Sequence, residues 1–178
     1  TEPEHIPLPE RLPPQRHLRA WLVSVRSIVC SCSRYPDIAM YWIRACELIP
    51  ETTFKQLADT EWCPSFEGTV PKDAFKRLDA RLSLAIMHYK TGILGMDMHM
   101  FQEEMHNEFR QASGRQLLWM ILKQYRLNYE LGGGTYDITA VQGFRIESGN
   151  VDSIHKALLD WDMILKNLHD RSMITDAF

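Results

Sequence analysis

Apolar residues recur every three or four positions along most of this chain, which is the spacing of one face of an α-helix. The first such face runs from Leu18 to Val29 and includes Trp21. The second follows Pro36, a residue type favoured in the first turn of a helix, and includes Trp42. The same spacing predicts further helices over residues 53–58, 72–89, 96–112, 115–129 and 151–169.

Two of these predicted helices present well-defined apolar faces. In the fifth helix of the chain the inward positions are Met98, Phe101, Met105, Phe109 and Ala112. In the last helix they are Ile154, Leu158, Trp161, Leu165 and Leu168. Helix ends are expected at Pro50, Gly92, Gly95, Ser113 and Gly114, and N-caps at Thr53 and at Asn150 or Asp152. Residues 115–129 are the most apolar stretch, so their helix is expected at the centre of the core.

No segment alternates between apolar and polar residues for long enough to predict a β-sheet. Residues 60–71 contain tryptophan, proline and glycine without a period and are interpreted as a packed loop. A flexible break is expected at residues 131–134, a brief turn at 136–141 and a short extended piece at 143–149. The predicted class is therefore all-α, an irregular multi-helix bundle with Trp21, Trp42 and Leu82 among its core residues.

The N-terminal residues 1–14 contain five of the nine prolines in the chain. Such a segment is expected to be an extended, poorly packed and flexible tail. Residues 15–178 then form one helical domain. Phe178 falls at what resembles the start of another helix, so the domain is expected to be truncated at its C-terminal end.

Composition and charge exclude several classes of function for this chain. The 178 residues carry a formal net charge of -3, which supplies no overall field to attract nucleic acid. No apolar run approaches the roughly 20 residues of a membrane span, and no signal peptide is visible, so an intracellular, cytoplasmic protein is expected. The spacing of the four cysteines fits no zinc motif, so reduced, mostly buried thiols are expected, with a redox or metal role as the alternative.

The stretch GMDMHMFQEEMH, residues 95–106, combines residue types that bind metals. His99, Glu103 and His106 fall at i, i+4 and i+7 and share one helix face, where they form a candidate metal site. His99 and His106 each follow directly after a residue of the predicted apolar face, and Glu103 lies one turn along from His99. Their face therefore lies at the boundary between the apolar face and solvent. A di-iron site also requires a second Glu-x-x-His on another helix, and the other match, Glu2 to His5, lies in the proline-rich tail. The favoured interpretation is a helix edge, with no metal and no cofactor.

No catalytic or phosphate-binding motif is found. Gly132–Gly134 matches neither glycine-rich phosphate motif and is interpreted as a hinge. The cluster Arg110, Arg115, Lys123 and Arg126 follows several glutamates and lacks interleaved aromatic residues, so it is interpreted as a solvated face of mixed charge rather than an RNA surface. The chain is not expected to be an enzyme or to bind a small-molecule substrate.

Several strings, in this order, resemble one known family. They are Trp21 in the first helix, Trp42 in the second, Thr53-Phe-Lys-Gln-Leu57, Leu78-Asp-Ala-Arg-Leu82, Gly114-Arg-Gln-Leu-Leu-Trp119, and Leu158, Trp161, Leu165 and Leu168 in the last helix. Together they resemble the Gag-like capsid polypeptides of copia-type LTR retrotransposons, in a divergent form found in protists. The resemblance covers residues 16–178 and implies that Trp119, Leu158, Trp161 and Leu165 are core or helix-packing residues.

The resemblance further implies a non-enzymatic structural protein that self-assembles into a particle. Element RNA would then be packaged through other regions of the polyprotein, and the expected partner is a second copy of this chain. Two alternatives remain: a cellular adaptor that binds a partner protein in a helical groove, and a metal-dependent enzyme on the His99, Glu103 and His106 face.

Overall fold

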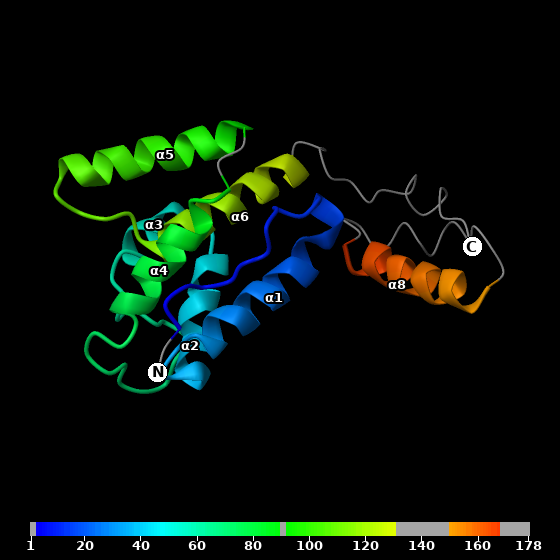
Figure 1. Ribbon diagram of the computed structural model, residues 1–178, viewed down its shortest axis with the longest axis horizontal. Helices are drawn as coiled ribbons and strands as arrows, with labels where there is room; N and C mark the ends of the chain where they lie inside the picture. Colours follow the sequence, from blue (N-terminus) through cyan, green and yellow to red (C-terminus); the bar gives the residue numbers. More distant parts are fainter. Residues whose placement is uncertain (1–2, 90–91, 131–149, 168–178) are drawn as a thin grey trace. The chain divides into compact units, whose positions relative to one another are not determined.

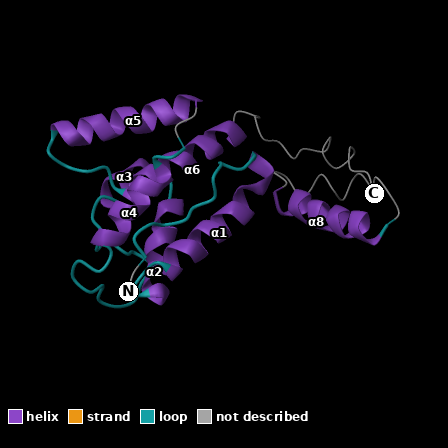
Figure 2. Ribbon diagram, viewed as in Figure 1, coloured by secondary structure: helices purple, strands orange, loops and turns teal. Residues whose placement is uncertain are grey.

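The computed structural model of the protein describes residues 3–89, 92–130 and 150–167 (Figure 1). This part of the chain contains seven α-helices and two short 3-10 helices, and no β-strand lies within it (Figure 2). The predicted all-α class and the irregular multi-helix arrangement are therefore confirmed. The predicted break at 131–134, turn at 136–141 and extended piece at 143–149 lie outside the described residues.

The chain divides into two compact units. The first, Thr1–Leu12 with Ala20–Arg126, holds most of the helices. They are α1 (Leu18–Ser31), α2 (Pro36–Arg44), the 3-10 helix η2 (Ala45–Glu47), α3 (Glu51–Gln56), α4 (Lys76–Ile86), α5 (Gly92–Asn107) and α6 (Gly114–Glu130). The second unit, Pro13–Arg19 with Leu127–Phe178, holds the 3-10 helix η1 (Gln15–His17) and α8 (Val151–Asn167), which contact each other. The sequence had suggested one helical domain over residues 15–178.

The core of the first unit forms around α6 and α4. Side chains of α6 are buried at Leu117, Leu118, Ile121 and Leu122, and those of α4 at Leu78, Leu82 and Ile86. Trp42 of α2 stacks on Phe75, just before α4, with ring centroids 5.0 Å apart. Burial of so much apolar side-chain surface is the main force that holds these helices together.

The residues predicted to pack in the core are buried in the first unit, but not all of them are buried in the second. Trp21, Trp42, Leu82 and Trp119 of the first unit are all buried. In α8 of the second unit, Leu158 was expected to face inward but is 62% exposed, while Ala157 is buried and Trp161 is half-buried. The side chain of Leu165 is not among those described. In the first turns of α8 the buried position is thus Ala157 and not Leu158, while Trp161 keeps its predicted side, because the surface packed against a helix selects its buried face and apolar spacing alone does not.

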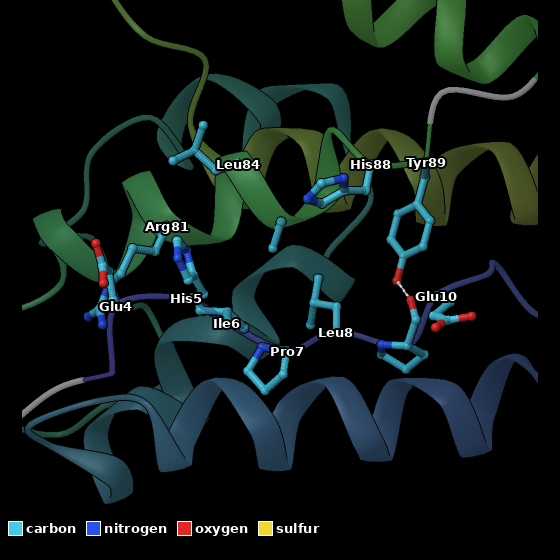
Figure 3. A pocket seen from close by; sticks show the side chains of 12 residues that line it. Glu4, His5, Ile6, Pro7, Leu8, Glu10, Arg81, Leu84, His88 and Tyr89 are labelled. Atoms are coloured by element: carbon cyan, nitrogen blue, oxygen red, sulfur yellow. Dashed lines mark hydrogen bonds between the residues drawn. The ribbon is translucent and has the colours of Figure 1, made fainter.

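The N-terminal segment, residues 3–12, was expected to be poorly packed, and this expectation is wrong. Ile6 is buried, and the Tyr89 hydroxyl donates a hydrogen bond to the Pro9 carbonyl oxygen (Figure 3). The Arg81 guanidinium donates one to the Pro3 carbonyl oxygen. Proline fixes the backbone in an extended conformation at little entropic cost. The N-terminal segment therefore lies along α4 as a strap.

Helix α5 begins and ends elsewhere than predicted. Gly92 is its first residue, with φ of +68°, and Gly95 lies buried inside the helix instead of breaking it. The helix ends at Asn107 rather than at Ser113. There the Arg110 amide donates to the Met105 carbonyl and the Phe109 amide to the His106 carbonyl, while Phe109 itself takes φ of +58°. This is a Schellman ending, in which a left-handed residue terminates the helix.

Two predicted helix starts also shift. Thr53 was expected to cap a short helix, but α3 begins at Glu51 after Pro50, and Thr53 is buried within it. Helix α4 begins at Lys76 and not at residue 72, because a turn with Asp73 at φ of +57° precedes it. Asn150 does cap α8, since its Oδ1 accepts the Ser153 amide at 2.7 Å. Of the two side-chain caps that the sequence predicts, at Thr53 and at Asn150, the structure thus contains the cap at Asn150.

Candidate functional site

Helix α5 leaves most of its surface in solvent. Of its 16 residues only Gly95 and Met98 are buried, and the Phe101 ring packs against Phe54 of α3 with centroids 5.2 Å apart. On another side Ile93, Met96 and Met100 are 75%, 67% and 64% exposed. These three residues, at i, i+3 and i+7, form one continuous apolar row, which we call the methionine row. Such contiguous exposed apolar surface is typical of interaction sites.

The candidate metal residues lie on α5 as a solvated edge. His99 Nε2 is 3.5 Å from Glu103 Oε1, both side chains are about two-thirds exposed, and His106 is exposed too. Within the described residues no three His, Cys, Asp or Glu side chains are grouped so as to hold a metal ion. The structure therefore gives His99 and Glu103 the geometry of a weak surface pair.

Phe109 was predicted to face inward and instead is fully exposed. Left-handed backbone costs a non-glycine residue roughly 1–2 kcal/mol. Here the Schellman hydrogen bonds of α5 offset that cost and turn the ring outward. The predicted inward face of α5 is correct only for Met98, with Phe101 and Met105 half-buried, whereas Ala112 is buried beyond the helix.

Arg115 was predicted to lie on a solvated face, and this prediction is wrong, because its side chain is fully buried. Its Nη1 donates to the carbonyl oxygens of Trp42 at 3.1 Å and Trp62 at 2.9 Å, and its Nη2 donates to the Asp59 carbonyl. The guanidinium also lies over the Trp42 ring, 4.7 Å from its centroid. Arg115 thus ties α6 to α2 and to the loop after α3.

Asp79 of α4 is the buried partner charge. Its Oδ1 accepts the Arg115 backbone amide at 3.0 Å and lies 3.0 Å from the Ser113 hydroxyl, so it caps the N-terminus of α6 from another helix. Burial raises the pKa of Asp79, and the bonds from Arg115 and Ser113 oppose that rise. Burial likewise lowers the pKa of Arg115, against the attraction of nearby groups that include Asp79. The pair organises the core, and Asp79, with Ser113 beside it, also lines a cavity of about 720 Å³.

Two other residues of this basic cluster, Arg110 and Lys123, form surface ion pairs away from Arg115. Arg110 Nη1 is 3.4 Å from Glu108 Oε2, and Lys123 Nζ is 3.2 Å from Glu51 Oε1. Arg110, Arg115 and Lys123 therefore make no common RNA surface.

A different set of cations, which was not predicted from the sequence, does converge in the structure. Arg34, Lys72, Lys76, Arg77 and Arg81, together with Tyr35, line a groove of about 1070 Å³, which we call the basic groove. The signal was present in the spacing, since Lys72, Lys76, Arg77 and Arg81 lie four, one and four residues apart along α4 and the turn before it. Arg34 and Tyr35 come from the turn after α1, and only tertiary structure brings them to α4.

A second cavity, of about 510 Å³, lies between the N-terminal segment and α4 (Figure 3). Its wall mixes apolar and charged side chains, among them His5, Glu10, Leu84 and His88. Both histidines are exposed, and in the described hydrogen bonds neither contacts a carboxylate or a hydroxyl that would make it a general base. This cavity is lined on one side by the N-terminal segment and on the other by α4 and the residues just after it.

The thiols have the environment expected of structural cysteines. Cys30, Cys32 and Cys46 are buried and Cys63 is half-buried, and all four are free. Burial raises the pKa of Cys46 to about 12, and it also raises the pKa of Cys30 and Cys63. Thiols with raised pKa values are poor nucleophiles at neutral pH.

Comparison with known proteins adds no family. No protein-family model, curated protein or solved structure matches this chain. In the described part of the chain no helix has both the length and the apolar character that crossing a membrane requires.

Proposed function

We propose that this chain is a non-enzymatic, capsid-like structural protein that associates with copies of itself through α5. The observation that carries the proposal is the methionine row, Ile93, Met96 and Met100, exposed on a helix that buries only Gly95 and Met98. A monomer gains nothing from three large apolar side chains placed together in water. Methionine is flexible and polarisable, so it adapts to a partner surface.

An antiparallel pair of α5 helices fits this surface. In a twofold dimer the same patch serves both copies. If the pair is centred near Met98, Glu103 and Glu104 of one copy lie beside the first residues of α5 in the other, where the helix dipole is positive. The contact is then apolar in the middle and complementary in charge at both ends.

The expected strength is modest. Two helices paired over a few turns bury less than the roughly 800 Å² per partner of a standard interface. Assemblies built from repeated copies use such weak contacts, because many of them act together. The exposed Phe109 adds a further aromatic contact near the end of the same helix.

The retrotransposon part of the proposal rests on the resemblance of the spaced strings from Trp21 to Leu168 to copia-type Gag polypeptides. Under that proposal the protein forms part of a particle in the cytoplasm, and basic regions elsewhere in the polyprotein contribute to RNA packaging. An adaptor would use the same methionine row for an unrelated protein. The two functions differ in whether the purified chain associates with itself.

Sedimentation velocity from about 10 µM to 1 mM protein tests the proposal. The wild type is expected to shift from monomer to dimer or larger species, with a Kd in the micromolar to millimolar range that a small interface gives. Met96→Glu/Met100→Glu is expected to remain a monomer throughout, because four carboxylates would meet at the centre of the twofold contact. Both positions are exposed, so circular dichroism and thermal unfolding should change little.

The matched control is Val23→Glu/Leu84→Glu, which introduces the same charges at two other exposed apolar positions. It is expected to associate as the wild type does. A wild type that stays monomeric at 1 mM would overturn self-association by this chain, and equal loss in the control would show that net charge and not α5 governs it.

A further inference from the structure

The basic groove concentrates positive charge on an acidic protein. Five Lys or Arg side chains line it, against the carboxylates Glu4 and Asp73, which gives the lining a balance of +3 in a chain of net charge -3. The groove belongs to the first unit, between the turn after α1, the first turns of α4 and the start of the N-terminal segment. A concave surface of one sign focuses the electric field and attracts an oppositely charged ligand.

Most of these cations lack a strong internal partner. Within the described residues no carboxylate pairs with Arg34, Lys72 or Arg77 in a salt bridge. Lys76 Nζ is 3.9 Å from Asp73 Oδ1, and both side chains are well exposed, so this pair contributes little. Arg81 has a different role, because it donates to the Pro3 carbonyl and holds the strap at the edge of the groove.

The backbone of α4 adds to the same field. Its N-cap residue, Phe75, provides no side-chain hydrogen bond to the first amides of the helix. Lys72, Asp73, Ala74 and Lys76 line the groove, so the positive end of the α4 dipole lies at its wall. Phosphate groups are the anions that helix N-termini and clustered Lys and Arg bind together.

Tyr35 makes the groove more than a charged patch. Its ring is half-buried, and the Arg34 guanidinium lies over it, 5.7 Å from the centroid. An aromatic ring with an arginine beside it is the platform on which an unpaired base stacks, whatever its identity. A flat anionic membrane cannot enter a concave groove, and an acidic peptide gains nothing from the ring.

We propose that the basic groove binds single-stranded nucleic acid, with Arg34, Lys72, Lys76 and Arg77 on the phosphates and Tyr35 under a base. This site lies in the chain itself and is not supplied by other polyprotein regions. It goes beyond self-association and does not require it, because the groove is complete in one copy. The two proposals can therefore fail separately.

Fluorescence anisotropy with a labelled 20-nucleotide RNA and a DNA of the same sequence tests the proposal. The full chain is used below 1 µM, where α5 contacts are expected to be dissociated. Lys72→Gln/Arg77→Gln removes two exposed groove cations, and Arg44→Gln/Lys55→Gln removes two exposed cations that do not line it. Both variants have the same net charge, so they differ only in where charge is lost.

The groove variant is expected to bind the RNA about tenfold more weakly than the wild type near 0.1 M salt. The slope of log affinity against log salt concentration should also be smaller in magnitude by about 1.4, since each of the two lost phosphate contacts on a single strand contributes about 0.7. The control should bind within about twofold of the wild type. Ultraviolet crosslinking followed by peptide mass spectrometry should place a crosslink at Tyr35.

Three results would overturn the proposal. The first is that both variants bind the RNA more weakly by the same factor, and the second is that neither variant binds more weakly than the wild type. The third is that all crosslinks lie at residues outside the groove. Displacement of the RNA by polyglutamate or phosphatidylserine vesicles at equal charge concentration would assign the groove to another anion instead. Binding of RNA and DNA alike supports the proposal, because phosphates and bases are common to both, and preference for RNA would add a contact to the 2′-hydroxyl.

Discussion

At the scale of single residues, Arg115 and Asp79 decide how the first unit is held together. Both are buried, and between them they bond to backbone groups of three separate segments. A buried charge costs several kcal/mol unless hydrogen bonds and an opposite charge compensate it. Losing one member of such a pair is therefore much worse than losing a surface charge.

Arg115→Met should lower the free energy of unfolding by about 3–5 kcal/mol, since it removes the nearby positive charge that favours the ionised form of buried Asp79 and leaves the Trp42, Trp62 and Asp59 carbonyls unbonded. Urea unfolding followed by circular dichroism measures this loss. Arg110→Met, the same change at an exposed position, should alter stability by less than about 0.5 kcal/mol. Equal effects at the two positions would contradict the buried role of Arg115.

At the scale of helices, α4 and α6 approach so closely that their contact requires glycine. A Cβ placed on Gly114 would lie 2.6 Å from the Asp79 carbonyl oxygen and 2.6 Å from the Ser83 amide nitrogen. These are backbone atoms, so no side-chain rotation relieves the clash. The close approach also lets Asp79 reach the first amides of α6.

Gly114→Ala should destabilise the protein by about 2–3 kcal/mol, because the added methyl group forces two core helices apart. The gain in helix propensity, at most about 1 kcal/mol, is too small to compensate. Thermal unfolding and urea unfolding both measure the difference. Gly68→Ala serves as the control, since its Cβ would meet only the Phe66 ring, which can move; a similar loss there would contradict the assignment to the α4–α6 contact.

At the scale of the whole molecule, stability and interaction surfaces lie on different helices. Every side chain from Leu117 to Trp119, and again at Ile121 and Leu122, is buried in α6, whereas α5 buries two of its 16 residues. Regions with few buried contacts open at low free energy, and core helices open only with the whole unit. The proposed association surface thus lies on a helix, α5, whose local stability in the isolated chain is expected to be low.

Hydrogen exchange read by mass spectrometry should separate the two helices. In dilute protein the amides of residues 117–122 are expected to exchange at least about 100-fold more slowly than those of residues 96–104. Raising the concentration should slow exchange in α5 alone, if α5 is the contact between copies. Exchange in dilute α5 as slow as in α6 would contradict this distribution of stability.

Periodicity was sufficient for the fold class and for much of the first unit's core. Trp21, Trp42 and Leu82 fall on apolar helical faces, and the central position of α6 follows from its uninterrupted apolar residues. Helix termini were less predictable, because Gly92, Gly95 and Phe109 behave according to backbone geometry and neighbours rather than residue type. The separation of Met98 from His99 and Glu103 did follow from spacing, since a shift of one residue rotates a side chain by about 100° around a helix.

The sequence by itself determined that the chain is helical and which residues prefer to leave water, because those preferences are local and repeat with the helical period. Only tertiary structure decided that Arg115 is buried, that Arg34 and Tyr35 join α4 in the basic groove, and that the methionine row of α5 stays uncovered. Each of these depends on which segments meet in space. A charged side chain is solvated or buried according to the carbonyl groups that other segments present to it, and no spacing along one helix contains that information.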